Sequence, residues 1–343
     1  MNIFATKLQT KHHILIMLHK RIENLISLKN FLLQNDEELK LIKEKAEREN
    51  GWFIQDFIEK SIQNICNEYL DENNLILYSS TLQTAEIKNK QLKIGVTMAG
   101  NIPLVGFHDF LSVYLSGHHQ LIKLSSKDNV LLPYIIQFLY QIDDANRKII
   151  SIESMLKNCD AYIATGSNSS AMYFEKYFSK YPHIIRKNKT SIAILTGNET
   201  VSELEKLADD VYLYFGLGCR NITKIFVPKG YDFKNLLNVF RKYDNLKHHN
   251  KYRNNYDYNL ALYILNNQFY MTNESLLLIE NKNNFSAVAT LHYEYYDEEI
   301  VIENKEEIQA IIGDGFIPFG QAQSPSLHDF ADGINTIDFL NSL

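Results

Sequence analysis

A cysteine that follows two glycines is the residue of this chain best suited to covalent chemistry. Residues 214–221 read Tyr-Phe-Gly-Leu-Gly-Cys-Arg-Asn, which places Cys219 between an expected helix and an expected strand. The glycines leave the backbone uncrowded, and a thiol near positive charge or a helix end can become a nucleophile as its pKa falls. A small buried residue is the alternative for Cys219, and it is the favoured interpretation for Cys66 and Cys159.

An asparagine at the end of an apolar run is the second candidate. Asn101 follows Gly100 and precedes Pro103, just before a helix expected over 104–116. Its carboxamide could donate a hydrogen bond to an oxyanion, or it could cap that helix, whose first turn would tolerate Pro103. The residues alone leave both interpretations open.

Two further segments place small residues where a ligand could bind. Thr165, Gly166 and Ser167 end an apolar run and open a helix, whose free N–H groups and positive dipole end favour a phosphate. The segment matches neither the dinucleotide fingerprint nor the P-loop. The loop 317–325, with Phe319 between a proline and a glycine, either closes over a site or is an ordinary loop.

Composition argues against several other classes of protein. The 343 residues carry 35 Lys and Arg against 41 Asp and Glu, so the net charge of −6 offers no field for nucleic acid. Three cysteines provide no disulfide framework and suggest the cytoplasm. The adjacent histidine pairs at 118–119 and 248–249 point apart, so we expect no metal site. No apolar run is long enough to predict a membrane span.

The elements that must position these residues follow from hydrophobic periodicity. Residues 14–70 repeat apolar side chains at three- and four-residue steps, which predicts two or three helices with a break at Asn35 and Asp36. From residue 92 onward, short apolar runs alternate with helix-length segments, which predicts an α/β fold with a largely parallel sheet. The expected strands are 93–100, 120–126, 147–152, 160–167, 183–187, 191–197, 221–228, 274–280 and 286–296. The expected helices are 104–116, 130–140, 171–178, 201–211, 233–243 and one around 305–311, and we expect 247–258 to be a solvated loop or helix rim.

Taken in order, the motifs resemble those of the aldehyde dehydrogenase superfamily, and most closely the long-chain acyl-CoA reductases of the bacterial bioluminescence (LuxC) type. The resemblance extends over roughly residues 92–340. It implies that Cys219 is the nucleophile and that Asn101, in an N-x-P-L turn, lines the oxyanion hole. It also implies a set of cofactor-binding residues, namely Lys123, Ser125, Ser126, Gly166, Ser167 and Phe319.

The same resemblance implies an aldehyde-dehydrogenase-like fold, with a Rossmann-like cofactor domain, an α/β catalytic domain and an N-terminal helical segment. The expected division is a helical segment 1–75 that packs on the cofactor domain, an NAD(P)-binding domain 76–197 and a catalytic domain 198–325. A tail, 326–343, then returns to the cofactor domain or to a subunit interface.

Two departures from the superfamily bear on the reaction. Hydrolytic members carry a glutamate in an E-L-G-G strand end, and the segment compared with it here, 194–197, has no carboxylate, so slow hydrolysis of an acyl-enzyme is expected. A thiol such as coenzyme A could still exchange with the acyl group. NAD-preferring members often carry a glutamate at the position of Ser126. Without it a 2′-phosphate fits, so we expect NADPH to be preferred and NADH to be usable.

The expected activity is NADPH-dependent reduction of a long-chain acyl-CoA to the fatty aldehyde through a Cys219 thioester. One alternative is the same chemistry on an acyl-phosphate or a carrier-protein thioester. Another is a catalytically silent dinucleotide-binding subunit that scaffolds an acyl-transfer complex. An acyl-transferase or acyl-protein synthetase is the expected kind of protein partner, and the sequence leaves open whether the chain forms a homo-oligomer.

Overall fold

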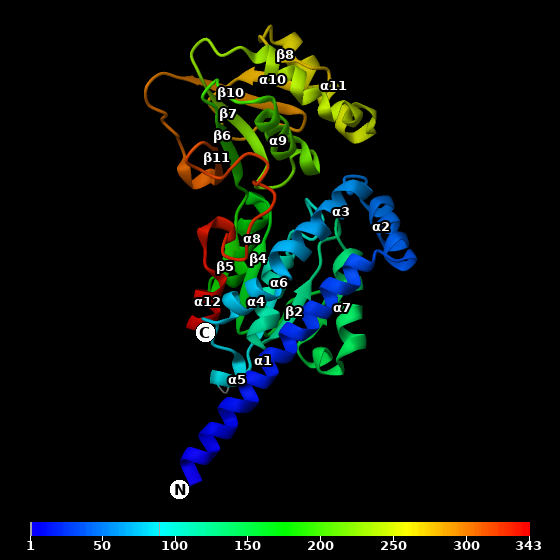
Figure 1. The fold of residues 1–343 in the computed structure, drawn as a ribbon, viewed down its shortest axis with the longest axis vertical. Coiled ribbons are helices and arrows are strands. Elements are labelled where there is room, and N and C mark those ends of the chain that lie inside the picture. Colours follow the sequence, from blue (N-terminus) through cyan, green and yellow to red (C-terminus); the bar gives the residue numbers. More distant parts are fainter. Residues whose placement is uncertain (1, 89) are drawn as a thin grey trace. The chain divides into compact units, whose positions relative to one another are not determined.

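Two compact units make up the computed structural model, which describes residues 2–88 and 90–343 (Figure 1). Unit 1 comprises the chain up to Lys187 together with Ser326–Leu343, and unit 2 comprises Asn188–Pro325. The chain enters unit 2 after Lys187 rather than near Gly197, the expected end of the cofactor domain. The reason is that β6 (Thr190–Ile194) pairs with strands of the second unit.

Helices form the N-terminal part of unit 1. They are α1 (Asn2–Gln34), α2 (Glu37–Glu49), α3 (Gln55–Asn64), a π-helical turn (Ile65–Tyr69), α4 (Glu72–Ser79) and α5 (Ala85–Lys88). The expected break is confirmed, because Asn35 adopts a left-handed φ of 46° and the Asp36 side chain accepts a hydrogen bond from Leu39 N. Leu25, Leu28 and other buried side chains of these helices join the same hydrophobic core as the strands of unit 1.

A five-stranded parallel sheet is the centre of unit 1. Its strands are β1 (Lys93–Thr97), β2 (His119–Lys123), β3 (Ile150–Ile152), β4 (Ala161–Thr165) and β5 (His183–Arg186), in the order β3-β2-β1-β4-β5. The connecting helices are α6 (Phe107–Ser116), α7 (Leu131–Ile142) and α8 (Asn168–Phe178). The direction of winding reverses between β1 and β4, and doubly wound sheets bind their ligands outside the carboxyl ends of the strands at such a switch point.

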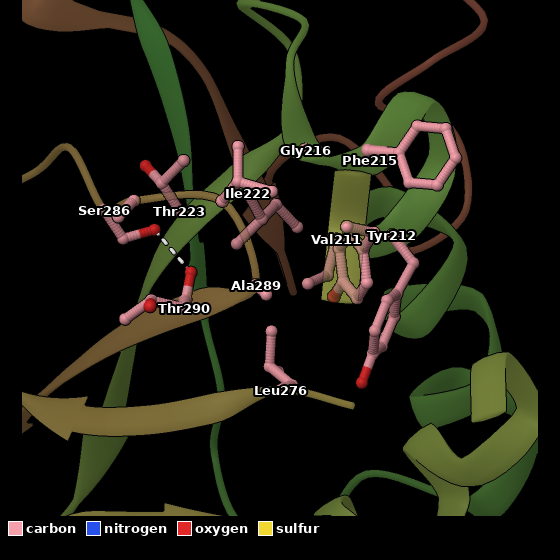
Figure 2. Close-up of a pocket in the computed structure, with 13 residues that line it drawn as sticks. Val211, Tyr212, Phe215, Gly216, Ile222, Thr223, Leu276, Ser286, Ala289 and Thr290 are labelled. Carbon is pink, nitrogen blue, oxygen red and sulfur yellow. Dashed lines mark hydrogen bonds between the residues drawn. The ribbon is translucent and has the colours of Figure 1, made fainter. Parts of the chain in front are cut away.

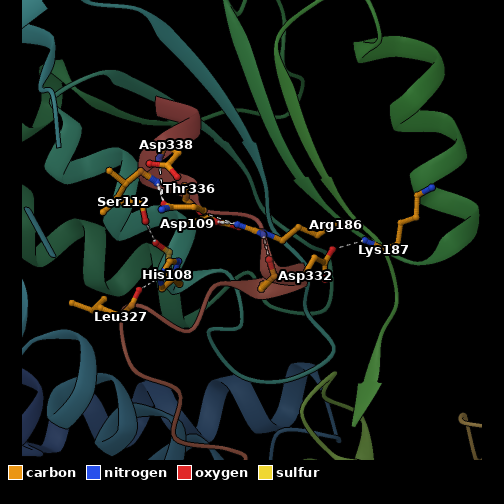
Figure 3. A network of polar contacts seen from close by, with 12 residues as sticks. His108, Asp109, Ser112, Arg186, Lys187, Leu327, Asp332, Thr336 and Asp338 are labelled. Carbon is orange, nitrogen blue, oxygen red and sulfur yellow. Dashed lines mark hydrogen bonds and ion pairs between the residues drawn. The ribbon is translucent and has the colours of Figure 1, made fainter. Parts of the chain in front are cut away.

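The C-terminal segment returns to unit 1, where it accepts hydrogen bonds from Arg186, a residue that also forms a buried ion pair (Figure 3). Arg186 contacts both carboxylate oxygens of Asp109, with Nη2–Oδ1 at 2.7 Å and Nε–Oδ2 at 3.1 Å. The same guanidinium donates to Ala331 O at 2.6 Å and to Thr336 Oγ1 at 2.9 Å, just before and at the start of α12 (Thr336–Ser342). Burial alone would raise the pKa of Asp109, but the adjacent Arg186 charge holds it below its usual value.

Unit 2 is built on a six-stranded sheet in the order β11-β6-β7-β10-β9-β8. Besides β6, the strands are β7 (Ile222–Pro228), β8 (Met271–Thr272), β9 (Leu277–Glu280), β10 (Thr290–Tyr296) and β11 (Ile308–Gly313), and only β8 pairs antiparallel. The helices are α9 (Val201–Tyr212), α10 (Phe233–Val239) and α11 (Asn250–Leu265). These two sheets with their helices confirm the α/β fold class.

Two expectations for unit 2 need correction. The helix expected around 305–311 is wrong, because only Lys305–Glu307 form a 3-10 turn and the following apolar residues form β11. These residues pair with β6 and bury Ala310 and Ile312, so sheet pairing overrides the helical appearance of the acidic start. The polar stretch 247–258 lies largely in α11, which buries Tyr252 and Tyr256.

Among the residues described, no helix is long and apolar enough to cross a membrane.

Candidate active site

The turn that carries Cys219 begins with a reversal of the backbone after α9. Tyr214, Phe215 and Gly216 have φ values of 55°, 57° and 74°, so three consecutive residues are left-handed. Glycine tolerates this conformation, whereas Tyr214 and Phe215 hold it at a cost and are fixed by burial. Strain held in this way before a thiol is typical of a functional turn.

Asn221 holds the turn together from its other side. Its side chain is fully buried. Nδ2 donates to Asp210 O at 3.0 Å and to Leu213 O at 2.8 Å, and Oδ1 accepts from Gly218 N at 2.8 Å. The amide therefore joins the end of α9 to the residue before Cys219, and the backbone on both sides of the thiol is fixed.

The three thiols differ in exposure. Cys219 is partly exposed, whereas Cys66 and Cys159 are buried. Burial raises the pKa of the Cys66 thiol to about 11 and also raises the pKa of Cys159, so both stay protonated at neutral pH. Their burial fits the packing role expected for these two residues.

The space behind the Cys219 turn is too small for a substrate. Figure 2 shows this cavity, which is lined by Phe215, Gly216, Ile222 and Ala289 among others and has a volume of about 20 Å³. That is room for about one water molecule. A long acyl chain therefore does not fit in this cavity.

The loop that carries Phe319 is tied to the end of α9. The fully buried carboxylate of Asp210 accepts hydrogen bonds from Gly320 N at 2.6 Å and from Ala322 N at 3.1 Å. Burial raises the pKa of Asp210 to about 7. Phe319 itself lines a recess of about 410 Å³ together with Thr196, Glu203 and Lys206. One side chain thus links the Phe319 loop to the helix that leads to Cys219.

The comparison of residues 194–197 with a catalytic strand end is wrong. Strands β6 and β7 are parallel, and their register pairs Ser191 with Ile222 and Ile194 with Phe226. Cys219 precedes β7, and Ser191 Oγ donates to Cys219 O at 3.1 Å, so the Cys219 turn lies beside the beginning of β6. Residues 196–197 follow the other end of that strand. The strand that ends just before β6 is β5, and residues 183–187 there also contain no carboxylate.

Asn101 lies in a turn of unit 1 that directly follows β1. Helix α6 begins only at Phe107, with Gly106 as its N-cap, so Asn101 does not cap that helix. Leu104, in the same turn, has a φ of 55°, and its N–H donates to Asp128 Oδ2 at 2.9 Å. The side chain of Asn101 is partly exposed. The structure therefore removes the capping alternative and leaves the donor role as the prediction.

The predicted cofactor residues of unit 1 lie at the carboxyl ends of its strands. Lys123 ends β2 with its side chain exposed, and Ser126 is also exposed. Ser125 lies against the Asn101 turn, because a Cβ atom on Gly100 would stand 2.6 Å from Ser125 Oγ. The structure thus brings the turn of Asn101 and the loop of Lys123 together.

At the end of β4, Ser167 is the N-cap of α8, and its hydroxyl accepts from Ser170 N at 3.2 Å. A Cβ atom on Gly166 would stand 2.8 Å from Ser170 Cβ, so only glycine fits there. This packing keeps the backbone close to the first turn of the helix, which is the arrangement suited to a phosphate group.

Three buried polar residues support these loops and were not predicted from the sequence. They are Asn221, Asp210 and Asp128. Asn221 stands two residues after the candidate nucleophile, and a polar residue between a glycine turn and an apolar strand is a usable signal for a turn-bracing side chain. Nothing in the sequence distinguishes Asp210 from its exposed neighbours, because its partners lie more than a hundred residues away.

The model of the acyl-CoA reductase (LuxC) family matches residues 8–236, which is more than half of the chain. No curated protein matches the sequence. The fold is similar to that of solved aldehyde dehydrogenases. An aldehyde dehydrogenase from Bacillus cereus superimposes with a TM-score of 0.63 at 12% identity, covering 86% of this chain and 71% of that one.

Two further structures are similar to the same extent. For an NAD-dependent aldehyde dehydrogenase from Sinorhizobium meliloti the TM-score is 0.60 at 10% identity, covering 81% of this chain and 65% of that one. For betaine aldehyde dehydrogenase from Staphylococcus aureus the TM-score is 0.60 at 8% identity, covering 82% of this chain and 68% of that one. At these identities the likeness shows the fold alone, and the chain spans about two thirds of their length. With the family model and the fold in agreement, the chain belongs to the acyl-CoA reductase (LuxC) family and is an oxidoreductase with an aldehyde-dehydrogenase-like fold.

Proposed function

We propose that this chain reduces a long-chain acyl-CoA to the fatty aldehyde, with NADPH as the preferred reductant. The observation that carries the proposal is Cys219, the partly exposed thiol of a strained and braced turn, in a chain that belongs to the acyl-CoA reductase family. The substrate class comes from the family, and the covalent step comes from the thiol.

In the first half of the proposed reaction, the Cys219 thiolate attacks the thioester carbonyl carbon. The negative charge that develops on the carbonyl oxygen is met by the Asn101 carboxamide and by the Cys219 backbone N–H. The carbon–sulfur bond to coenzyme A then breaks, and coenzyme A leaves as its thiolate. The product of this half is an acyl group bound to Cys219 Sγ.

In the second half, the acyl group on Cys219 Sγ would accept a hydride at its carbonyl carbon, which is the chemistry that a nicotinamide cofactor would supply when bound. This gives a thiohemiacetal on Cys219, which collapses to the aldehyde and the free thiolate. The same oxyanion donors serve both halves. No carboxylate occurs in residues 183–187 at the end of β5, which fits slow hydrolysis of the acyl-enzyme.

The residues at the carboxyl ends of β2 and β4 fit a dinucleotide. Gly166 and Ser167 would hold phosphate oxygens at the first turn of α8, and Lys123 with Ser125 would meet the adenosine ribose. Ser126 and Lys127 are exposed, and neither would repel a 2′-phosphate. The carboxylate of Asp128 is turned to Leu104 N instead. Phe319, in the loop held by Asp210, remains a proposed cofactor-binding residue.

Steady-state assays with NADPH and NADH against a panel of acyl donors test the proposal. The panel contains long-chain acyl-CoA, acyl-phosphate and acyl-carrier-protein, with the aldehyde product detected directly. We expect aldehyde from acyl-CoA, with NADPH preferred. A tenfold or greater preference for NADH would overturn the assignment of NADPH as the preferred cofactor. Formation of aldehyde from acyl-phosphate alone would overturn the assignment of acyl-CoA as the acyl donor.

A further inference from the structure

We propose that helices α2 and α3 and the residues that join them, 37–64, are part of the catalytic apparatus, because Ser61 and Asn50 position the turn of Asn101 and the loop beside it. The inference rests on the proposed function, since it concerns how the oxyanion donor is held. Ser61 and Asn50 are positioning residues and touch neither substrate nor cofactor.

The first contact comes from α3. The buried hydroxyl of Ser61 donates to Pro103 O at 2.8 Å. Pro103 stands two residues after Asn101 and one before the left-handed Leu104. The helix therefore holds a carbonyl group in the middle of the turn.

The second contact comes from the end of α2. The buried amide of Asn50 donates through Nδ2 to Lys127 O at 3.0 Å, while its Oδ1 accepts from Trp52 N at 3.1 Å. Lys127 lies in the loop that follows β2, between the predicted cofactor residue Ser126 and Asp128. The helical segment thus reaches both loops.

The two loops are also joined to each other. Asp128 Oδ2 accepts from Leu104 N at 2.9 Å, and Ser125 lies so close to Gly100 that no side chain fits at that position. The turn of Asn101 is accordingly held at Pro103 by α3, at Leu104 by Asp128 and at Gly100 by Ser125. The remaining side of the loop 125–128 is held by Asn50.

These contacts bear on catalysis because the turn is strained and its geometry must be kept. A non-glycine residue with φ near +55° is strained and persists only when its surroundings hold it. An oxyanion donor works only from a position within hydrogen-bond reach, and small displacements cost large factors in rate. Contacts at three points of the turn, Gly100, Pro103 and Leu104, supply this rigidity.

The experiment is a double-mutant cycle on the full-length protein. Wild type, Ser61→Ala, Asn101→Ala and the double variant are mixed with palmitoyl-CoA without cofactor, and the first release of coenzyme A thiol is timed. We expect Asn101→Ala to slow this acylation about 100-fold or more and Ser61→Ala to slow it about tenfold. In the Asn101→Ala background, Ser61→Ala should add less than a twofold effect.

Matched variants separate positioning from general stability. Ser79, whose buried hydroxyl donates to Ile76 O within α4, provides the control, and Ser79→Ala should leave acylation within twofold of wild type. Ser61→Thr, which keeps the hydroxyl, should restore most of the rate. If Ser61→Ala does not fold, Asn50→Ala is taken through the same cycle.

The outcomes distinguish the inference from the function on which it rests. If Asn101→Ala acylates as fast as wild type, the oxyanion assignment fails. If Asn101→Ala is slow but Ser61→Ala matches Ser79→Ala, the inference alone is overturned. It is also overturned if Ser61→Ala slows acylation by the same factor in both backgrounds, because Ser61 would then act independently of Asn101.

Discussion

Replacing Asn221 tests whether the Cys219 turn is held as the structure indicates. Its buried amide makes two short donated hydrogen bonds, to Asp210 O and Leu213 O, and one accepted bond from Gly218 N. At about 0.5–1.5 kcal/mol for each bond, Asn221→Ala should lower the free energy of unfolding by about 2–4 kcal/mol. Asn221→Asp should lower the free energy of unfolding further. A buried carboxylate has no N–H to donate, so it would face the two carbonyl oxygens without a hydrogen bond.

Urea denaturation measures the stability change, and the rate of Cys219 alkylation by iodoacetamide measures the state of the turn. We expect the denaturation midpoint to fall with little change in m-value. The alkylation rate and the acylation rate should change together, because the backbone on both sides of the thiol is released. Asn254→Ala, on the exposed face of α11, provides a control with little expected effect.

The reasoning would be refuted by an Asn221→Ala variant that unfolds within about 0.5 kcal/mol of wild type, which is the range of ordinary surface substitutions. It would also be refuted if stability fell as expected while acylation by Cys219 stayed unchanged. In that case the amide would stabilise unit 2 without positioning the thiol.

Two further predictions concern buried charged residues. Arg186→Met should lower the free energy of unfolding by about 3–5 kcal/mol, because it leaves Asp109 buried without its partner. The Arg186→Met/Asp109→Leu double variant should recover part of that loss in urea denaturation. If it recovers nothing, the unpaired Asp109 charge is not the cause of the loss. Burial raises the pKa of Asp210 to about 7, above an unfolded value of about 3.9, so its contribution to stability is present below about pH 4 and declines as pH rises toward 7. Asp210→Asn should flatten the pH dependence of unfolding across that window, and an unchanged profile would count against the raised pKa.

Much of the fold follows from local pattern, and the exceptions have physical causes. The strands of unit 1 could be predicted because each is a short apolar run closed by a small or polar residue. The start of β11 could not, because Glu306 and Glu307 give it the appearance of a helix start, and pairing with β6 decides its conformation. The polar α11 was ambiguous for a similar reason, since tertiary packing of its tyrosines, not periodicity, holds it.

The candidate site was predictable at its motifs but not at its supports. Cys219 and Asn101 are marked by neighbouring glycines and proline, which act locally. Asp210 is held by Gly320 and Ala322, far along the chain, so no window of sequence reveals it. The misplacement of the strand end at 194–197 has a related cause, because only the β6–β7 register shows which end of β6 lies beside the thiol.

The central claim is that Cys219 carries the acyl group during the reaction. Purified protein is mixed with a long-chain acyl-CoA without cofactor, quenched in acid, digested, and weighed by mass spectrometry. We predict one acyl group on Cys219, its loss with aldehyde formation when NADPH is added before the quench, and no adduct in Cys219→Ala. Aldehyde production by Cys219→Ala at a substantial fraction of the wild-type rate, or an adduct on Cys66 or Cys159 instead, would contradict the claim.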